Sequence, residues 1–234
     1  MKKNIKYILL LIVITFMGNG FLVSAATPES IFYLTWESNG LSPVDYQGKN
    51  LSSVDGVIKV SVQPLIYSGT GYSDSSRWQY RWYLDDEFAN VDGVGIKQFR
   101  FRIKGYNLNS HEVKVKITFP NGTIQEKVVI IPIVSPRAVI KPVIKSITLR
   151  DGIINTNESE VALIATPYFF SNANNLKIKW YRDGEYENND SLVKNNIIVK
   201  PSGSNSFLMK ILISDATDSL IRAIGQVRIN FLGI

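Results

Sequence analysis

The chain has 234 residues, of which 45% are hydrophobic and 20% are charged, and it carries a formal net charge of +6 with no cysteine. This balance excludes a disordered chain and a protein embedded in a membrane along its whole length, and the length fits one large or two small domains. The absence of cysteine excludes disulfides and cysteine-based metal or catalytic sites.

Residues 1–25 predict a secretory signal peptide. Lysines within residues 2–6 precede the apolar run 7–17, and residues 23–25 (Val-Ser-Ala) supply the small side chains of a cleavage site. Cleavage after Ala25 removes three lysines and lowers the formal charge from +6 to +3, which gives no reason to expect nucleic acid as a partner. The alternative is a retained membrane anchor, in which case this segment is the contact with the membrane.

The predicted location is the periplasm, the cell surface or the extracellular medium. Small exported domains of animals are usually stapled by disulfides, whereas exported bacterial proteins often do without them. The chain is therefore predicted to be a bacterial exported protein.

Residues 27–134 show the pattern of about seven short strands. Apolar and polar residues alternate along 57–64, 97–104 and 113–119, which is typical of half-buried β-strands. Residues 120–122 (Pro-Asn-Gly) are typical of a hairpin turn, because Asn-Gly readily adopts positive φ. Short strands with regular turns predict an antiparallel β-sandwich.

A tryptophan segment occurs twice. Residues 80–86 (YRWYLDD) recur loosely as residues 178–184 (IKWYRDG), with a spacing typical of one small sandwich domain. Three prolines mark residues 135–141 as a Pro-rich linker, with a second sandwich over 142–234. The predicted fold class is all-β, with two tandem antiparallel β-sandwich domains after the signal peptide.

Trp82, placed to fill the space between two sheets, resembles the core tryptophan of immunoglobulin-type (Ig-like) sandwiches. Residues 80–86, followed by 111–122 (HEVKVKITFPNG), resemble a PKD-type module, in which a Y-x-W strand runs into an acidic turn. A V-x-V-x-(V/I)-T strand ending in Asn/Asp-Gly completes that pattern. The Gly-Asp-Gly that follows the tryptophan strand in this family is missing in the first module and is reduced to Asp-Gly in the second.

The resemblance implies two tandem Ig-like or PKD-like sandwiches with Trp82 and Trp180 as structural core residues. It also implies a binding, adhesive or spacing role in bacterial envelope or secreted proteins. These implications rest on the family alone, since a fold by itself carries no function.

The residues that could carry catalysis are few. His111 is the only histidine, so a Ser-His-Asp hydrolase would have to use it, and no G-x-S-x-G segment is present. We expect His111 to be structural, and we predict a non-enzymatic protein without a cofactor.

Acidic residues follow the first tryptophan strand and make a weak calcium candidate. Oxygen ligands of Ca²⁺ must converge on one point, and the candidates are Asp85, Asp86 and Asp92. The alternative interpretation is a solvated polar turn, and it is the preferred one.

Outward tyrosines give the best candidate for binding. Tyr83 and Tyr181 occupy matching positions in the two tryptophan strands, with the outward cations Arg81 and Lys179 beside them. Exposed tyrosines on a flat sheet commonly contact glycans or proteins. Tyr67 and Tyr72, on the loop before the first tryptophan strand, are added to this predicted site.

The predicted function is an exported binding, adhesive or spacer protein of the bacterial cell envelope, with other envelope proteins or cell-surface glycan as partners. One alternative is a periplasmic pilus-assembly chaperone, which would offer an exposed strand carrying Val129, Ile131 and Ile133 to a subunit. Another is a polysaccharide-binding accessory protein.

Overall fold

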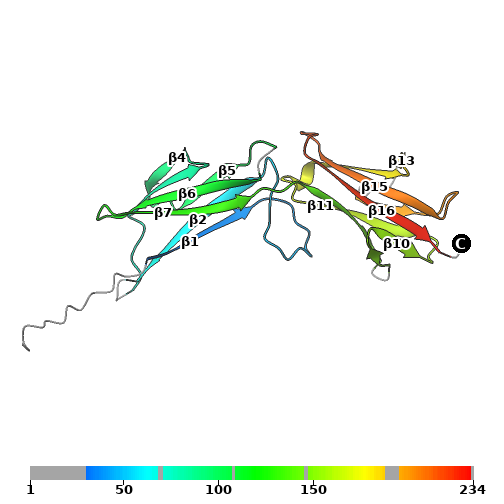
Figure 1. The fold of residues 1–234 in the computed structure, drawn as a ribbon, viewed down its shortest axis with the longest axis horizontal. Helices are drawn as coiled ribbons and strands as arrows, with labels where there is room; N and C mark the ends of the chain where they lie inside the picture. Colours follow the sequence, from blue (N-terminus) through cyan, green and yellow to red (C-terminus); the bar gives the residue numbers. More distant parts are fainter. Residues whose placement is uncertain (1–29, 68–70, 107–108, 145–146, 188–194, 233–234) are drawn as a thin grey trace, which may run out of the picture. The chain divides into compact units, whose positions relative to one another are not determined.

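The computed structural model describes residues 30–67, 71–106, 109–144, 147–187 and 195–232. The predicted signal peptide lies outside these ranges. Strands make up the regular structure apart from the three-residue 3-10 turn Ala173–Asn175 (Figure 1), and no helix within the described ranges is long and apolar enough to cross a membrane. The prediction of an all-β chain built of β-sandwiches is confirmed.

The chain divides into two compact units. Of the described residues, 30–31, 65–67 and 71–73 fall in a small unit, and those within 32–64 and 74–232 fall in a large one. Most strand residues of both sandwiches lie in the large unit.

Over its described residues, the first sandwich contains seven strands in two sheets. One sheet has the order β1-β2-β5 and the other the order β4-β3-β6-β7. Alternation explains the core: inward apolar residues of β2, β3, β5 and β6 are buried, whereas their polar neighbours point outward. The strands are β1 Ser30–Ser38, β2 Val57–Ile66, β3 Gln79–Leu84, β4 Glu87–Val94, β5 Gln98–Arg102, β6 Ser110–Thr118 and β7 Ile124–Pro132.

The second sandwich also has two sheets, with the orders β13-β12-β15-β16-β10-β9 and β14-β11-β8. Strand β10 pairs with β16 in parallel, and the other pairings are antiparallel. The strands are β8 Arg137–Pro142, β9 Leu149–Arg150, β10 Ile153–Thr156, β11 Val161–Tyr168, β12 Leu176–Arg182, β13 Glu185–Glu187, β14 Asn196–Val199, β15 Ser206–Asp215 and β16 Arg222–Phe231.

The predicted Pro-rich linker is corrected by strand β8. Residues 137–142 pair with β11 in register from Arg137↔Tyr168 to Pro142↔Leu163. Pro136 precedes this strand and Pro142 ends it, positions at which proline does not interrupt a ladder. Ala138 and Ile140 are buried between them, so the proline spacing marks the ends of an edge strand.

The acidic turns after the two tryptophan strands share one backbone geometry. Asp85 and Asp86 both have positive φ, of 51° and 66°, and Asp183 and Gly184 match them with 47° and 96°. Two central residues with positive φ define a type I′ hairpin turn, which suits the twist of the flanking strands.

Each turn is tied to the neighbouring strand by its first aspartate. The backbone N–H of Asp85 donates to the Glu112 carbonyl at 2.9 Å, and its carboxylate accepts from the Glu112 N–H at 2.9 Å. Asp183 makes the same two bonds with Leu208, also at 2.9 Å each. The acidic turn is therefore a structural clip that occurs in both sandwiches.

The strand expected to serve a chaperone does not present the predicted face. Ile131 is fully buried and Val129 is half-buried, because these positions of β7 point into the sandwich. The exposed apolar residues of β7 have the opposite parity and are Ile124, Val128 and Ile130.

Candidate functional site

Trp82 and Trp180 lie at the centre of the two sandwiches, with 0% and 1% of their surface exposed. The indole N–H of Trp82 donates to the Ile96 carbonyl at 2.9 Å. The indole N–H of Trp180 has no acceptor among the described residues. Burial of these residues turns their odd-numbered neighbours, Tyr83 and Tyr181, toward the outer face of each sheet.

Tyr83 lies in a row of three side chains that crosses strands β4, β3 and β6. It is paired with Phe88 on one side and with Lys114 on the other. The rings of Tyr83 and Phe88 lie 6.1 Å apart in an edge-to-face arrangement, and the Lys114 ammonium is 5.6 Å from the Tyr83 ring centroid. Both contacts are within the range of favourable aromatic and cation–π interactions.

Tyr181 lies in the same kind of row in the second sandwich. It is paired with Tyr186 on β13 and with Lys210 on β15. The two tyrosine rings are 6.0 Å apart and again edge-to-face. We call Phe88–Tyr83–Lys114 and Tyr186–Tyr181–Lys210 the two aromatic rows. Each offers an aromatic pair beside a cation on an outer sheet face.

The other predicted binding residues are placed differently. Arg81 forms an ion pair with Asp92 at 3.2 Å, and the hydrogen bonds to Asp92 and then to Tyr83 raise the pKa of Arg81. Lys179 is exposed on β12. Tyr67 and Tyr72 contact each other with ring centroids 6.2 Å apart, and they belong to the small unit. Arg81 therefore contacts the first row, with its guanidinium carbon 5.3 Å from the Phe88 ring centroid, whereas Lys179 lies on β12 two residues before Tyr181.

The calcium candidates do not converge. Asp85 binds His111 and the Glu112 N–H, Asp86 forms an ion pair with Lys114 at 2.5 Å, and Asp92 binds Arg81. Over the described ranges no group of three or more acidic or histidine side chains could hold a metal ion. These aspartates are arranged as partners of cations and of backbone N–H groups.

Sequence reasoning did not find the pairing of His111 with Asp85. The His111 Nδ1 lies 2.6 Å from the Asp85 carboxylate, and the histidine is 5% exposed. The two residues are 26 positions apart in the sequence, so no local motif predicts their contact. The pairing of β3 with β6 brings them together. Two members of a catalytic triad are thus present, but the residues lining the adjacent pocket include no serine, threonine or cysteine to act as nucleophile.

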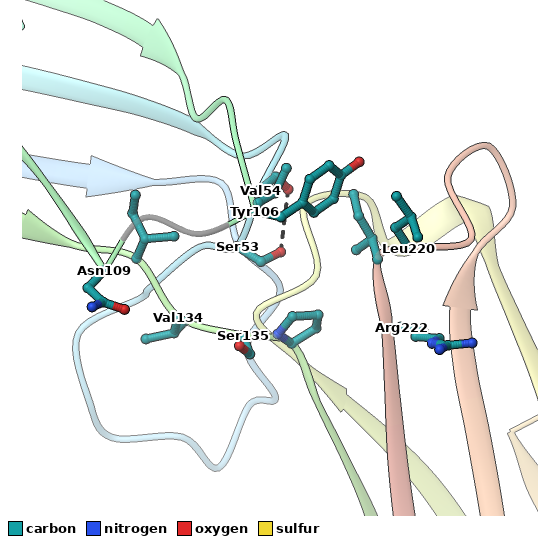
Figure 2. A pocket seen from close by; sticks show the side chains of 11 residues that line it. Ser53, Val54, Tyr106, Asn109, Val134, Ser135, Leu220 and Arg222 are labelled. Carbon is teal, nitrogen blue, oxygen red and sulfur yellow. Dashed lines mark hydrogen bonds between the residues drawn. The ribbon is translucent and has the colours of Figure 1, made fainter.

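A separate cavity of about 300 Å³ lies in the large unit, and Figure 2 shows the side chains that line it. Tyr106 donates a hydrogen bond from its hydroxyl to Asp218, and this bond raises the pKa of Tyr106. Arg222 is the one charged side chain in the lining. Its lining residues are Ser53, Val54, Tyr106, Asn109, Ile133, Val134, Ser135, Pro136, Leu220, Ile221 and Arg222.

No family model and no curated protein matches the chain. Among solved structures, similarity is found to three N-terminal domains of the highly immunogenic outer capsid protein (Hoc) of bacteriophage RB49. The identity is 11%, the alignment covers 86% of this chain and 59% of that one, and the TM-score is 0.45. The chain thus spans about three fifths of that structure.

Two further solved structures have lower TM-scores. The fibronectin(III)-like modules of Clostridium thermocellum CbhA share 13% identity over 85% of this chain and 94% of that one, with a TM-score of 0.30. The Bacteroides ovatus mixed-linkage glucan utilization locus protein SGBP-B, in complex with a heptasaccharide, shares 13% identity over 83% and 47%, with a TM-score of 0.28. With all three TM-scores below one half, the fold assignment rests on the strand order given above.

Proposed function

We propose that this chain is a non-enzymatic, exported binding and adhesive protein of the bacterial cell envelope, built of two PKD-like sandwiches, the first over residues 27–134 and the second beginning with strand β8 at Arg137. The two aromatic rows are the observation that supports this proposal. The same three-residue arrangement is built twice, from different sequences, at matching positions of two sheets.

The chemistry of the rows favours a glycan as ligand. A pair of aromatic rings beside a cation offers an apolar surface for the C–H face of a sugar and a donor for its oxygen atoms. Phe88 and Tyr186 are exposed, whereas Tyr83 and Tyr181 are half-buried and held between two partners. Such rigid aromatic side chains lose little entropy on binding. Two equal rows on one chain would also bind a repeating polymer with higher avidity than either row alone.

The proposal is tested with the mature chain immobilised and exposed to fractionated bacterial envelope. We expect retention of cell-wall or capsular glycan, and a loss of about 5- to 150-fold in apparent affinity when Tyr83→Ala and Tyr181→Ala are combined, since a stacking contact contributes about 0.5–1.5 kcal/mol per site. Each single variant should keep part of the binding.

Tyr33→Ala is the matched control, because Tyr33 is an exposed tyrosine on β1, outside both rows. It should bind as the wild type does. Equal binding by the double variant and by Tyr33→Ala would remove the aromatic rows as the binding surface. Retention of pilin-like subunits in place of glycan would favour a chaperone.

A further inference from the structure

The outer face of the large sheet in the second sandwich carries charge of one sign. Buried residues alternate with outward ones along β12, β15 and β16, so every second side chain of these strands lies on that face. Among the described residues, the outward positions of the three strands include five cations and no acid. The five are Lys177, Lys179, Lys210, Arg222 and Arg228.

None of these five cations forms an ion pair with a described residue. Arg222 lines the cavity shown in Figure 2. Lys177, Lys179 and Arg228 are exposed, and Lys210 is half-buried. Like charges that share one face repel each other and do not stabilise the sheet. Their presence together therefore needs an explanation other than folding.

Two of the cations have counterparts in the first sandwich, and there each counterpart is paired with an acid. Lys179 corresponds to Arg81, since each directly precedes the buried tryptophan of its strand. Lys210 corresponds to Lys114, since each is paired with the tyrosine that follows that tryptophan. Arg81 and Lys114 form ion pairs with aspartates of β4 and of the first acidic turn. In the second sandwich Gly184 replaces the aspartate of the turn, so the cation is kept and its acid is lost.

Three of the cations lie on one diagonal across the sheet. Lys179 is paired with Leu212, which places Lys210 at the next outward position of the neighbouring strand. Lys210 is paired with Gln226, and Arg228 is the next outward position in the same direction. Diagonal neighbours on a sheet are about 7–8 Å apart. Lys179, Lys210 and Arg228 therefore form a line of regularly spaced positive charges.

The surroundings of this diagonal suit sugar rings better than nucleotide bases. The second aromatic row crosses the diagonal at Lys210, with Tyr181 beside it and the exposed ring of Tyr186 next to Tyr181. An aromatic ring near a cation can contact the C–H face of a sugar while the cation binds the carboxylate of that sugar. Single-stranded nucleic acids bind largely by stacking of successive bases on aromatic rings, and the described residues of β15 and β16 present no aromatic ring outward.

We propose that the outer face of β12, β15 and β16 binds an acidic polysaccharide. Carboxylates along the polymer lie against Lys179, Lys210 and Arg228, and a sugar ring between them lies against Tyr186. Because the charges form a line, an extended polymer fits them better than a compact anion does. This inference rests on the proposed function, since it takes the second aromatic row as a glycan site and names the class of glycan. The first row, whose cation is paired with an acid, should show no such preference.

The test is isothermal titration calorimetry of the mature chain with hexagalacturonate and with its fully methyl-esterified form, which has the same sugars and no charge. We expect the acid to bind at least about tenfold more tightly than the ester, because a charge-assisted hydrogen bond is about twice as strong as a neutral one. Raising the NaCl concentration from about 50 mM to about 300 mM should weaken binding of the acid and leave binding of the ester unchanged, because salt screens exposed charges.

A triple variant tests the diagonal itself. Lys179→Gln combined with Lys210→Gln and Arg228→Gln should remove the preference for the acid over the ester. All three side chains point away from the core, so the variant should fold, and a melting curve followed by circular dichroism verifies this. The ratio of the two affinities is the readout, because a general loss of stability would weaken acid and ester alike.

The matched control combines Lys59→Gln, Arg100→Gln and Arg102→Gln. It removes the same charge from outward positions of β2 and β5, outside both aromatic rows, and should keep the preference for the acid.

Equal binding of acid and ester by the wild type, or a preference for the acid that survives in the diagonal variant, would overturn the inference and leave the proposed glycan binding intact. Tighter binding of an oligothymidylate, or of phosphatidylglycerol vesicles, than of hexagalacturonate would overturn it in favour of a nucleic acid or a lipid surface. Absence of binding to both acid and ester, with no envelope glycan retained, would contradict the proposed function as well.

Discussion

Asp215 ends strand β15, and its carboxylate holds the turn that follows. It is 7% exposed and accepts hydrogen bonds from the Thr217 N–H at 2.7 Å, the Thr217 hydroxyl at 2.5 Å and the Asp218 N–H at 3.2 Å. Burial raises the pKa of Asp215, but the hydrogen bonds from Thr217 and Asp218 outweigh burial and leave the pKa below its usual value of 3.8. The charged form is thus stabilised by folding.

Asp215→Ala should lower the free energy of unfolding by about 1–3 kcal/mol, because it leaves these donors without their acceptor. Asp215→Asn keeps an acceptor oxygen and should lose less. Since the folded-state pKa lies below the unfolded one, the contribution of the charge is fully present above pH 3.8 and is lost as the pH falls through the folded-state value. Urea unfolding of wild type and Asp215→Asn from pH 7 to pH 3 measures this. A stability difference that stays constant over that range would contradict the assignment.

For a single residue, the sequence predicts whether the side chain points inward or outward when that orientation depends on one strand alone. Alternation along residues 78–84 predicts that Trp82 is inward and Tyr83 outward, and both orientations are found. The partners of Tyr83 were not predicted, because Phe88 and Lys114 reach it through the register of two other strands. Periodicity gives the face of a strand, but register depends on turn geometry and on packing of the whole sheet.

For turns and strands too, the sequence predicts what depends on local residues and does not predict what depends on contacts between distant segments. The hairpin at Asn121-Gly122 was located from the sequence, since positive φ restricts the residue types that fit, and Gly122 has a φ of 83° between the paired strands β6 and β7. Strand β8 was missed because three prolines suggested a linker, whereas only Pro142 lies in the strand, at its last residue. The His111–Asp85 contact was also missed, because it requires the first acidic turn and the start of β6 to meet.

The two type I′ turns predict opposite changes in stability when their second residues, Asp86 and Gly184, are exchanged for each other's residue type. Asp86 has a φ of 66°, a conformation that glycine adopts at lower cost. Asp86→Gly should therefore raise the free energy of unfolding by up to about 1 kcal/mol, offset slightly by loss of the exposed ion pair with Lys114. At the equivalent position of the second sandwich, Gly184→Asp should lower it by about the same amount.

The Gly184 substitution isolates the backbone effect, because a Cβ at this position meets nothing within 4 Å. Asp86→Gly also removes the ion pair with Lys114. The contribution of that pair to stability is measured with Lys114→Gln, alone and combined with Asp86→Gly. Chemical denaturation of the four variants provides the comparison. If Asp86→Gly and Gly184→Asp change stability in the same direction, the turn conformation is not the source of the effect.

For the whole molecule, the net charge depends on whether the predicted signal peptide is removed. The predicted signal peptide carries three of the chain's 26 lysines and arginines and no acid, so its removal would leave a folded part that is only moderately basic. A modest net charge is consistent with a protein that binds through local features, such as the aromatic rows, and not through a general attraction to anionic polymers.

Expression of the full chain with a C-terminal tag in a bacterial host tests the predicted export. We expect the product outside the cytoplasm to begin at Ala26, because Val23 and Ala25 supply small residues at the positions that signal peptidase reads. Ala25→Arg places a large charge at the cleavage site and should leave the uncleaved chain in the membrane fraction. Thr27→Arg, two residues beyond the cut, is the matched control and should be processed normally. N-terminal sequencing and intact mass of each fraction give the result, and a wild-type product that keeps residues 1–25 in the membrane would establish an anchor in place of a cleaved signal.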